Sequence, residues 1–64
     1  MLGKNRIQEI RWERNISATL LSRLSGVSAS QIYRIERYEV SPTFDTMIRI
    51  SRALHMDVWD VFYC

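Results

Sequence analysis

Apolar residues recur every three or four positions along most of this 64-residue chain. That spacing places them on one face of an α-helix and predicts five helices. The expected bounds are residues 4–14, 18–25, 29–37, 44–54 and 58–62. The residues expected to face the core are Ile7, Ile10, Leu21, Leu24, Ile32, Ile35, Met47, Ile50, Ala53, Leu54, Val58, Val61 and Phe62, with Ile16 and Val27 added from the loops. The pattern predicts a small all-α protein in which each helix buries one face.

Residues that start and stop helices stand between these apolar stretches. Four residues are expected to cap the helices that follow them, namely Ser17, Ser28, Thr43 and Asp57. Asn15 and Gly26 are expected to end the first two helices, because both residue types tolerate positive φ. Ala18–Arg37 therefore has the layout of a helix-turn-helix, a motif whose second helix lies in the major groove of DNA.

The outward face of the third expected helix is basic. When its isoleucines point to the core, the opposite face carries a hydroxyl, an aromatic ring and two guanidinium groups, without a carboxylate. These residues are Ser30, Tyr33, Arg34 and Arg37. Such a face suits a polyanion, although on one isolated helix it also fits an ordinary solvent-exposed surface. Seven basic and three acidic residues give residues 1–37 a net charge of +4, whereas residues 38–64 carry −2. A nucleic acid is the expected partner of the basic part.

From Asn5 to Phe62 the chain resembles the Cro/cI-type helix-turn-helix regulators, also called the XRE family. The resemblance rests on a series of short matches in order rather than on one diagnostic motif. The main ones are Leu24-Ser25-Gly26-Val27-Ser28, Arg34-Ile35-Glu36-Arg37, Ser41-Pro42-Thr43, Ala53-Leu54 and Val61-Phe62. The resemblance implies a compact, five-helix, lambda-repressor-like DNA-binding domain, and we expect residues 1–64 to form this single domain.

The resemblance also implies roles for individual residues. The expected DNA base contacts are Ser28, Ala29, Ser30, Tyr33 and Arg34. The expected phosphate contacts are Ser17, Ala18 and Arg37. Arg11 and Glu36 are expected to form a structural ion pair between the first and third helices.

Some positions depart from the family pattern. Ala18 replaces the usual glutamine, which removes one side-chain phosphate contact. Tyr38 and His55 stand where glycine is common. Because a residue other than glycine takes positive φ at a cost, we expect the third helix to end differently or to run past Arg37.

The expected function is that of a sequence-specific, double-stranded-DNA-binding transcriptional regulator, acting as a repressor and binding as a homodimer. The candidate dimer contacts are Trp59, Tyr63, Phe44 and Met56, although Phe44 and Met56 could equally pack within one chain. The alternative is a protein-interaction module, or the antitoxin of a toxin–antitoxin pair, that retains the fold. Exposed Leu20 and Trp12 would fit that alternative.

Composition excludes several other classes. His55 is the one histidine and Cys64 the one cysteine, so neither a zinc finger nor a catalytic triad can be assembled. We therefore expect no enzymatic activity, no metal and no cofactor. The absence of a long apolar run predicts no membrane span, and the lack of a possible internal disulfide fits a cytoplasmic location.

Overall fold

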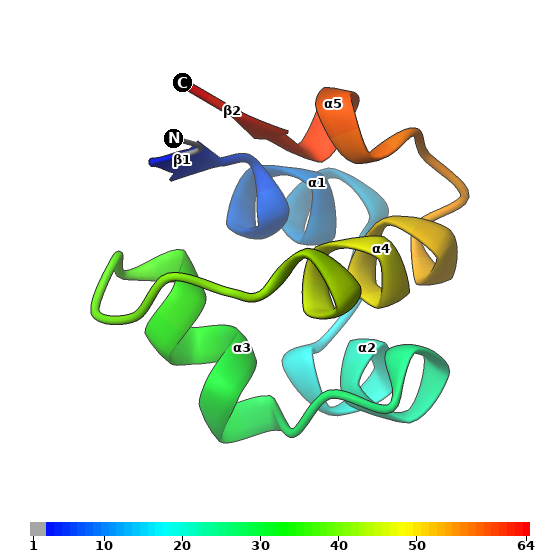
Figure 1. Cartoon of the computed structure of the whole chain (residues 1–64). Coiled ribbons are helices and arrows are strands. Elements are labelled where there is room, and N and C mark those ends of the chain that lie inside the picture. The colour runs from blue at the N-terminus through cyan, green and yellow to red at the C-terminus, as the bar shows by residue number, and fades with distance from the viewer. Residues whose placement is uncertain (1–2) are drawn as a thin grey trace.

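The computed structural model describes residues 3–64 and shows five helices and one two-stranded sheet within them (Figure 1). The elements are β1 (Lys4–Asn5), α1 (Ile7–Arg14), α2 (Ala18–Ser25), α3 (Ala29–Glu36), α4 (Phe44–Ala53), α5 (Val58–Val61) and β2 (Phe62–Tyr63). The predicted compact five-helix fold is therefore confirmed. No helix among residues 3–64 is both long and apolar enough to cross a membrane.

The small sheet corrects two predicted helix boundaries. The first helix begins at Ile7 rather than Lys4, and the fifth ends at Val61 rather than Phe62. Strands β1 and β2 pair antiparallel, with Lys4 opposite Tyr63 and Asn5 opposite Phe62. The two ends of the described chain consequently lie side by side (Figure 1). Backbone pairing between the ends thus replaces the predicted first helical turn of α1 and the predicted last residue of α5.

The core contains buried side chains from every helix and from β2. It consists of Ile7, Ile10, Ala18, Leu21, Val27, Ile32, Ile35, Met47, Ile50, Leu54, Val61 and Phe62. Val58, Ala53 and Ile16 are half-buried and pack against it.

Leu24 was predicted to face the core, and this prediction was wrong, because its side chain is 57% exposed. The buried face of α2 consists of Ala18, Leu21 and Ser25, spaced three and four residues apart. Leu24 lies off this face, near Leu20, which is also exposed. Helix α2 therefore packs with small residues at both ends of its inner face.

The predicted N-caps are confirmed at all four helices. The side chains of Ser17, Ser28, Thr43 and Asp57 each accept a hydrogen bond from a backbone N–H in the first turn of the following helix. These bonds satisfy donors that have no partner within the helix.

Three helices end at a residue other than glycine with positive φ, namely Asn15 (55°), Tyr38 (61°) and His55 (57°). Helix α3 therefore does not run past Arg37, because Tyr38 itself adopts the left-handed conformation. The N–H of Tyr38 donates to Ile35 O (3.1 Å) and that of Glu39 to Arg34 O (2.9 Å), the pair of bonds that closes a Schellman turn. The hydroxyl of Tyr38 also donates to Asn5 O at 3.4 Å, a tertiary contact that helps to offset the backbone cost.

His55 offers a direct test of this backbone cost. Its side chain is exposed, and His55→Gly removes the Cβ that disfavours positive φ. We expect the free energy of unfolding to rise by about 0.5–1 kcal/mol, or a few degrees in melting temperature. The control is Arg52→Gly, in the exposed last turn of α4, which should destabilise the protein because glycine is a poor helix former. Thermal denaturation of both variants checks the sign, and a destabilised His55→Gly protein would contradict the argument.

Candidate nucleic-acid interface

A tight turn sets the angle between α2 and α3. Gly26 has φ of 76°, and a Cβ built there would lie 3.4 Å from Nη1 of Arg49. Val27 follows with its side chain buried in the core, and Ser28 Oγ accepts from the N–H of Gln31 at 3.1 Å. Glycine adopts this backbone conformation at the lowest cost, while Val27 and Ser28 hold the start of α3 in place.

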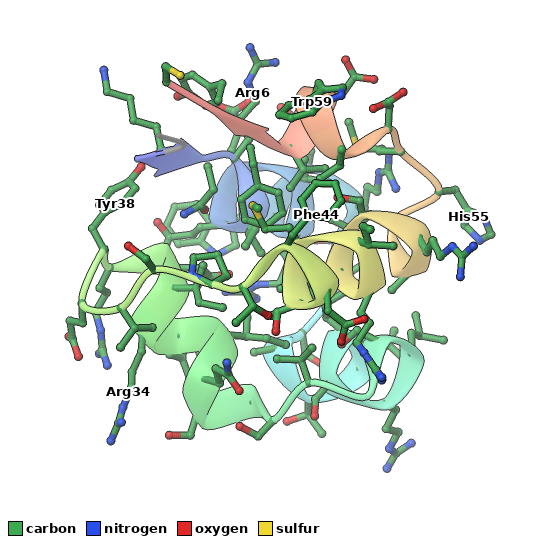
Figure 2. All side chains as sticks on the ribbon, in the orientation of Figure 1. Arg6, Arg34, Tyr38, Phe44, His55 and Trp59 are labelled. Carbon is green, nitrogen blue, oxygen red and sulfur yellow. The ribbon has the colours of Figure 1, made fainter. Side chains whose placement is uncertain are left out.

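Helix α3 has two distinct faces. Ile32, Ile35 and Glu36 are buried, which fixes the orientation of the helix against the body of the protein. The opposite face is exposed and includes Ser28, Ser30, Tyr33, Arg34 and Arg37, whereas Ala29 is half-buried and packs against the core. In Figure 2 the side chain of Arg34 extends from the outer side of α3 away from the other helices. The structure thus brings four of the five residues expected to contact bases onto one accessible surface, namely Ser28, Ser30, Tyr33 and Arg34.

A buried ion pair connects α1 to α3. Arg11 Nε lies 2.7 Å from Glu36 Oε2, and Arg11 Nη2 lies 3.0 Å from Glu36 Oε1. The third nitrogen of the guanidinium, Nη1, donates to Ile16 O at 3.1 Å. Only 7% of the Arg11 side chain and 2% of the Glu36 side chain are exposed. The hydrogen bonds with Glu36 raise the pKa of Arg11 above its ordinary value, against the opposing effect of burial.

The same arginine supports an aromatic side chain on the exposed face of α3. The guanidinium carbon of Arg11 lies 5.8 Å from the centroid of the Tyr33 ring, within the range of a cation–π contact. Glu36 holds Arg11 from one side, while Tyr33 covers it from another. The ring of Tyr33 is therefore packed against a fixed group, although the residue is 46% exposed.

The residues expected to contact phosphates differ in the chemical group that is free to make the contact. Ser17 Oγ accepts from the N–H of Leu20 at 3.0 Å, which leaves its hydroxyl proton available to another acceptor. Ala18 is buried, so only its backbone can take part. Arg37 is exposed, and its Nε lies 2.9 Å from Glu39 Oε2, a partner that the sequence reasoning did not identify.

Exposed aromatic side chains lie on α4, α5 and β2, and Figure 2 shows two of them, Phe44 and Trp59, apart from Arg34 on α3. The rings of Phe44 and Trp59 have centroids 6.5 Å apart, and both side chains are more than half exposed. Tyr63 in β2 is also exposed, and the guanidinium of Arg6 lies 5.3 Å from its ring centroid. Met56 is half-buried and packs against the core, so it offers less surface to a partner than the three aromatic residues.

Comparison with known proteins gives the class of this fold. A helix-turn-helix family model matches residues 7–58, which span α1 to the start of α5. The chain belongs to this family, that of the Cro/cI-type regulators, and is accordingly a DNA-binding transcriptional regulator.

One solved structure similar to this chain is the crystal structure of the P22 c2 repressor in complex with a synthetic operator in the presence of Tl⁺. The two chains share 29% sequence identity and superpose with a TM-score of 0.77. The match covers 91% of this chain and 88% of the repressor chain. No curated protein sequence matches.

The contribution of the ion pair between α1 and α3 to stability can be tested by removing the charge of Glu36. In Glu36→Gln the buried guanidinium of Arg11 loses its neutralising charge, so we expect a loss of about 3 kcal/mol in the free energy of unfolding. The control is Asp45→Asn, which breaks an exposed ion pair with Arg49 four residues along α4 and should cost about 0–1 kcal/mol. Urea denaturation of the two variants measures the difference in stability. Equal midpoints would show that the buried Arg11 pair contributes no more to stability than the exposed pair of Asp45 and Arg49.

Proposed function

We propose that this protein binds a specific duplex DNA operator as a homodimer, with α3 in the major groove, and represses transcription there. The observation that carries the proposal is the division of α3 into a buried face and an exposed face. The exposed face presents hydroxyl, aromatic and guanidinium groups and no carboxylate. The similar P22 c2 repressor, whose crystal structure is a complex with a synthetic operator, supports operator DNA as the partner.

The side chains on that face, and that of half-buried Ala29, suit different features of base pairs. Arg34 can donate two parallel hydrogen bonds to O6 and N7 of guanine. Ser28 and Ser30 have short hydroxyl side chains that can donate or accept, and the methyl group of Ala29 can contact the methyl group of thymine. Because these three side chains are short, Arg34 and Tyr33 would supply most of the discrimination between sequences.

Contacts to the DNA backbone would position α3. The N-terminus of α2, with the hydroxyl of Ser17 and the backbone N–H of Ala18, can hold one phosphate. Arg37, at the other end of the helix-turn-helix, can hold a second. Neither contact distinguishes one base from another, so both would strengthen binding to every sequence.

The aromatic surface of Phe44, Trp59 and Tyr63 is the proposed dimer contact. One helix-turn-helix reads few base pairs, so two copies on half-sites about one helical turn apart are needed for high specificity. Exposed aromatic side chains supply large contact areas at low entropic cost, and tryptophan is the residue most often dominant in such interfaces.

The exposed leucines of α2 favour one other function. Leu20 and Leu24 are both exposed, and so is Trp12 on α1. These side chains could contact a second protein, as in an interaction module or an antitoxin that retains the fold.

Selection from random duplex DNA separates the two functions. An enriched palindromic sequence would support both operator binding and a two-fold dimer. An absence of enrichment would reject operator binding and favour the interaction module.

Arg34 and Arg37 should behave differently on the selected operator. We expect Arg34→Ala to weaken operator binding by about 1–3 kcal/mol and to relax base preference at one position in each half-site. Arg37→Ala should instead weaken binding to all sequences alike and reduce its salt dependence, because it removes a phosphate contact. Binding titrations against the operator and its single-base variants distinguish the two patterns, and unchanged preference in Arg34→Ala would remove Arg34 from the reading surface.

Two exposed tryptophans provide a matched test of the dimer contact. Trp59→Ala should weaken dimerisation at least about tenfold, because truncating a central aromatic residue removes most of its contact. Trp12→Ala removes the same side chain from α1, where 66% of the residue is exposed, and should leave dimerisation unchanged. Sedimentation equilibrium gives both constants. The proposed surface is wrong if the two variants dimerise equally well.

A further inference from the structure

The turn after α3 places a carboxylate against one of the cations of the proposed DNA-contacting surface. Arg37 caps the C-terminus of α3, and the chain reverses at Tyr38 through its positive φ. The bond from the N–H of Glu39 to Arg34 O, 2.9 Å long, holds the backbone of Glu39 against the last turn of the helix. Glu39 Oε2 then lies 2.9 Å from Nε of Arg37.

Stability does not account for this ion pair. The side chain of Arg37 is 62% exposed and that of Glu39 is 51% exposed. Water screens a pair of this kind, and holding two long side chains in one geometry costs entropy, so its contribution to folding is small. The pair therefore matters for the surface charge of the protein more than for its fold.

Glu39 is exceptional within its part of the sequence. Between Ser28 and Phe44 the chain has two carboxylates, Glu36 and Glu39. Glu36 is buried and neutralised by Arg11, whereas Glu39 is exposed. A surface that otherwise attracts phosphates through Arg34 and Arg37 thus has one negative charge at its edge.

We propose that Glu39 competes with DNA phosphates for Arg37 and thereby limits the affinity of the protein for DNA of any sequence. This inference rests on the proposed function. Carboxylate and phosphate oxygens accept the same guanidinium N–H groups, so Arg37 can contact a phosphate only after it leaves Glu39. The displaced carboxylate then lies near the DNA backbone and has to be neutralised by a cation from solution. Binding consequently releases fewer counterions than the number of basic side chains would suggest.

This competition affects how affinity is divided between phosphates and bases. Phosphate contacts strengthen binding to all sequences, whereas base contacts strengthen binding to the operator alone. By weakening one phosphate contact, Glu39 leaves a larger share of the total affinity to the base-contacting residues of α3. The residue would therefore shorten the time that the protein spends on non-operator DNA.

Binding of Glu39→Gln to a random-sequence duplex tests the proposal. We expect the variant to bind about three- to tenfold more tightly than wild type at low salt, with a plot of log K against log[KCl] steeper by about 0.9. The gain should shrink as KCl is added, because salt screens exposed charges. Fluorescence anisotropy at several KCl concentrations measures both quantities, and melting temperatures show that the fold is kept.

Two further variants isolate the role of Arg37. Asp60→Asn removes the same charge from α5, outside the helix-turn-helix, and should not change affinity for the random-sequence duplex. In an Arg37→Ala background, Glu39→Gln should gain much less than in wild type, because no guanidinium is left to release. The proposal fails if Glu39→Gln binds no more tightly than wild type, if Asp60→Asn matches it, or if its gain survives without Arg37. Wild-type protein that binds no duplex at all would overturn the proposed function as well, whereas operator binding unaffected by Glu39→Gln would overturn this proposal alone.

Discussion

The buried pair of Arg11 and Glu36 is the interaction on which the orientation of α3 depends. It joins α1 to α3 by two hydrogen bonds, and the remaining guanidinium nitrogen bonds to the loop that leads into α2. A buried ion pair contributes less to stability than apolar groups of the same shape would, because both charges lose their hydration. The pair instead fixes the orientation of α3, because hydrogen bonds are directional. Apolar contacts in so small a core would tolerate a rotated or shifted α3, whereas two hydrogen bonds between the same side chains would not. Because Tyr33 packs over the same guanidinium, this constraint extends from the core to the exposed face.

The two ends of α3 are held by different means. At its start, Gly26 and buried Val27 fix the turn from α2. At its end, the amide of Asn5 donates to Ile35 O at 3.0 Å, and Asn5 O accepts from Tyr38. Asn5 belongs to β1, whose partner β2 contains Tyr63. The strand pair therefore connects the end of α3 to the aromatic surface proposed for dimerisation, so that a partner bound there would be placed in a defined relation to α3.

Features that depend on interactions between residues close in the sequence could be predicted. Features that depend on contacts between distant residues could not. The five helices and all four N-caps follow from local periodicity and from side chains that bond within one turn, so they were predicted correctly apart from the start of α1 and the end of α5. The strands join residues at opposite ends of the chain, and no two-residue segment has a local signal for such pairing. The left-handed Tyr38 is compensated partly by its bond to Asn5, which only the folded structure shows. Leu24 was wrongly predicted to face the core because an eight-residue helix allows more than one apolar face. In the folded protein the buried face of α2 is the one that contains Ala18 and Ser25. On the candidate interface, the helical wheel separated the outward residues of α3 from the buried ones, but it could not show that Glu39 returns to Arg37 across the turn.

A modest net charge fits the proposed function, in which the protein discriminates between DNA sequences. A strongly basic surface would bind every duplex tightly, and the far more numerous non-operator sites would then hold most of the protein. Here the positive charge lies mainly in residues 1–37, while residues 38–64 are net acidic. Glu39 is the first acidic residue of residues 38–64, and the reversal at Tyr38 returns its carboxylate to the end of α3. The positive φ of Tyr38 thus places the carboxylate that we propose to compete with DNA for Arg37. Rigid placement of α3 and limited attraction to phosphates act together, because base contacts decide between sequences only when the remaining contacts do not dominate the affinity.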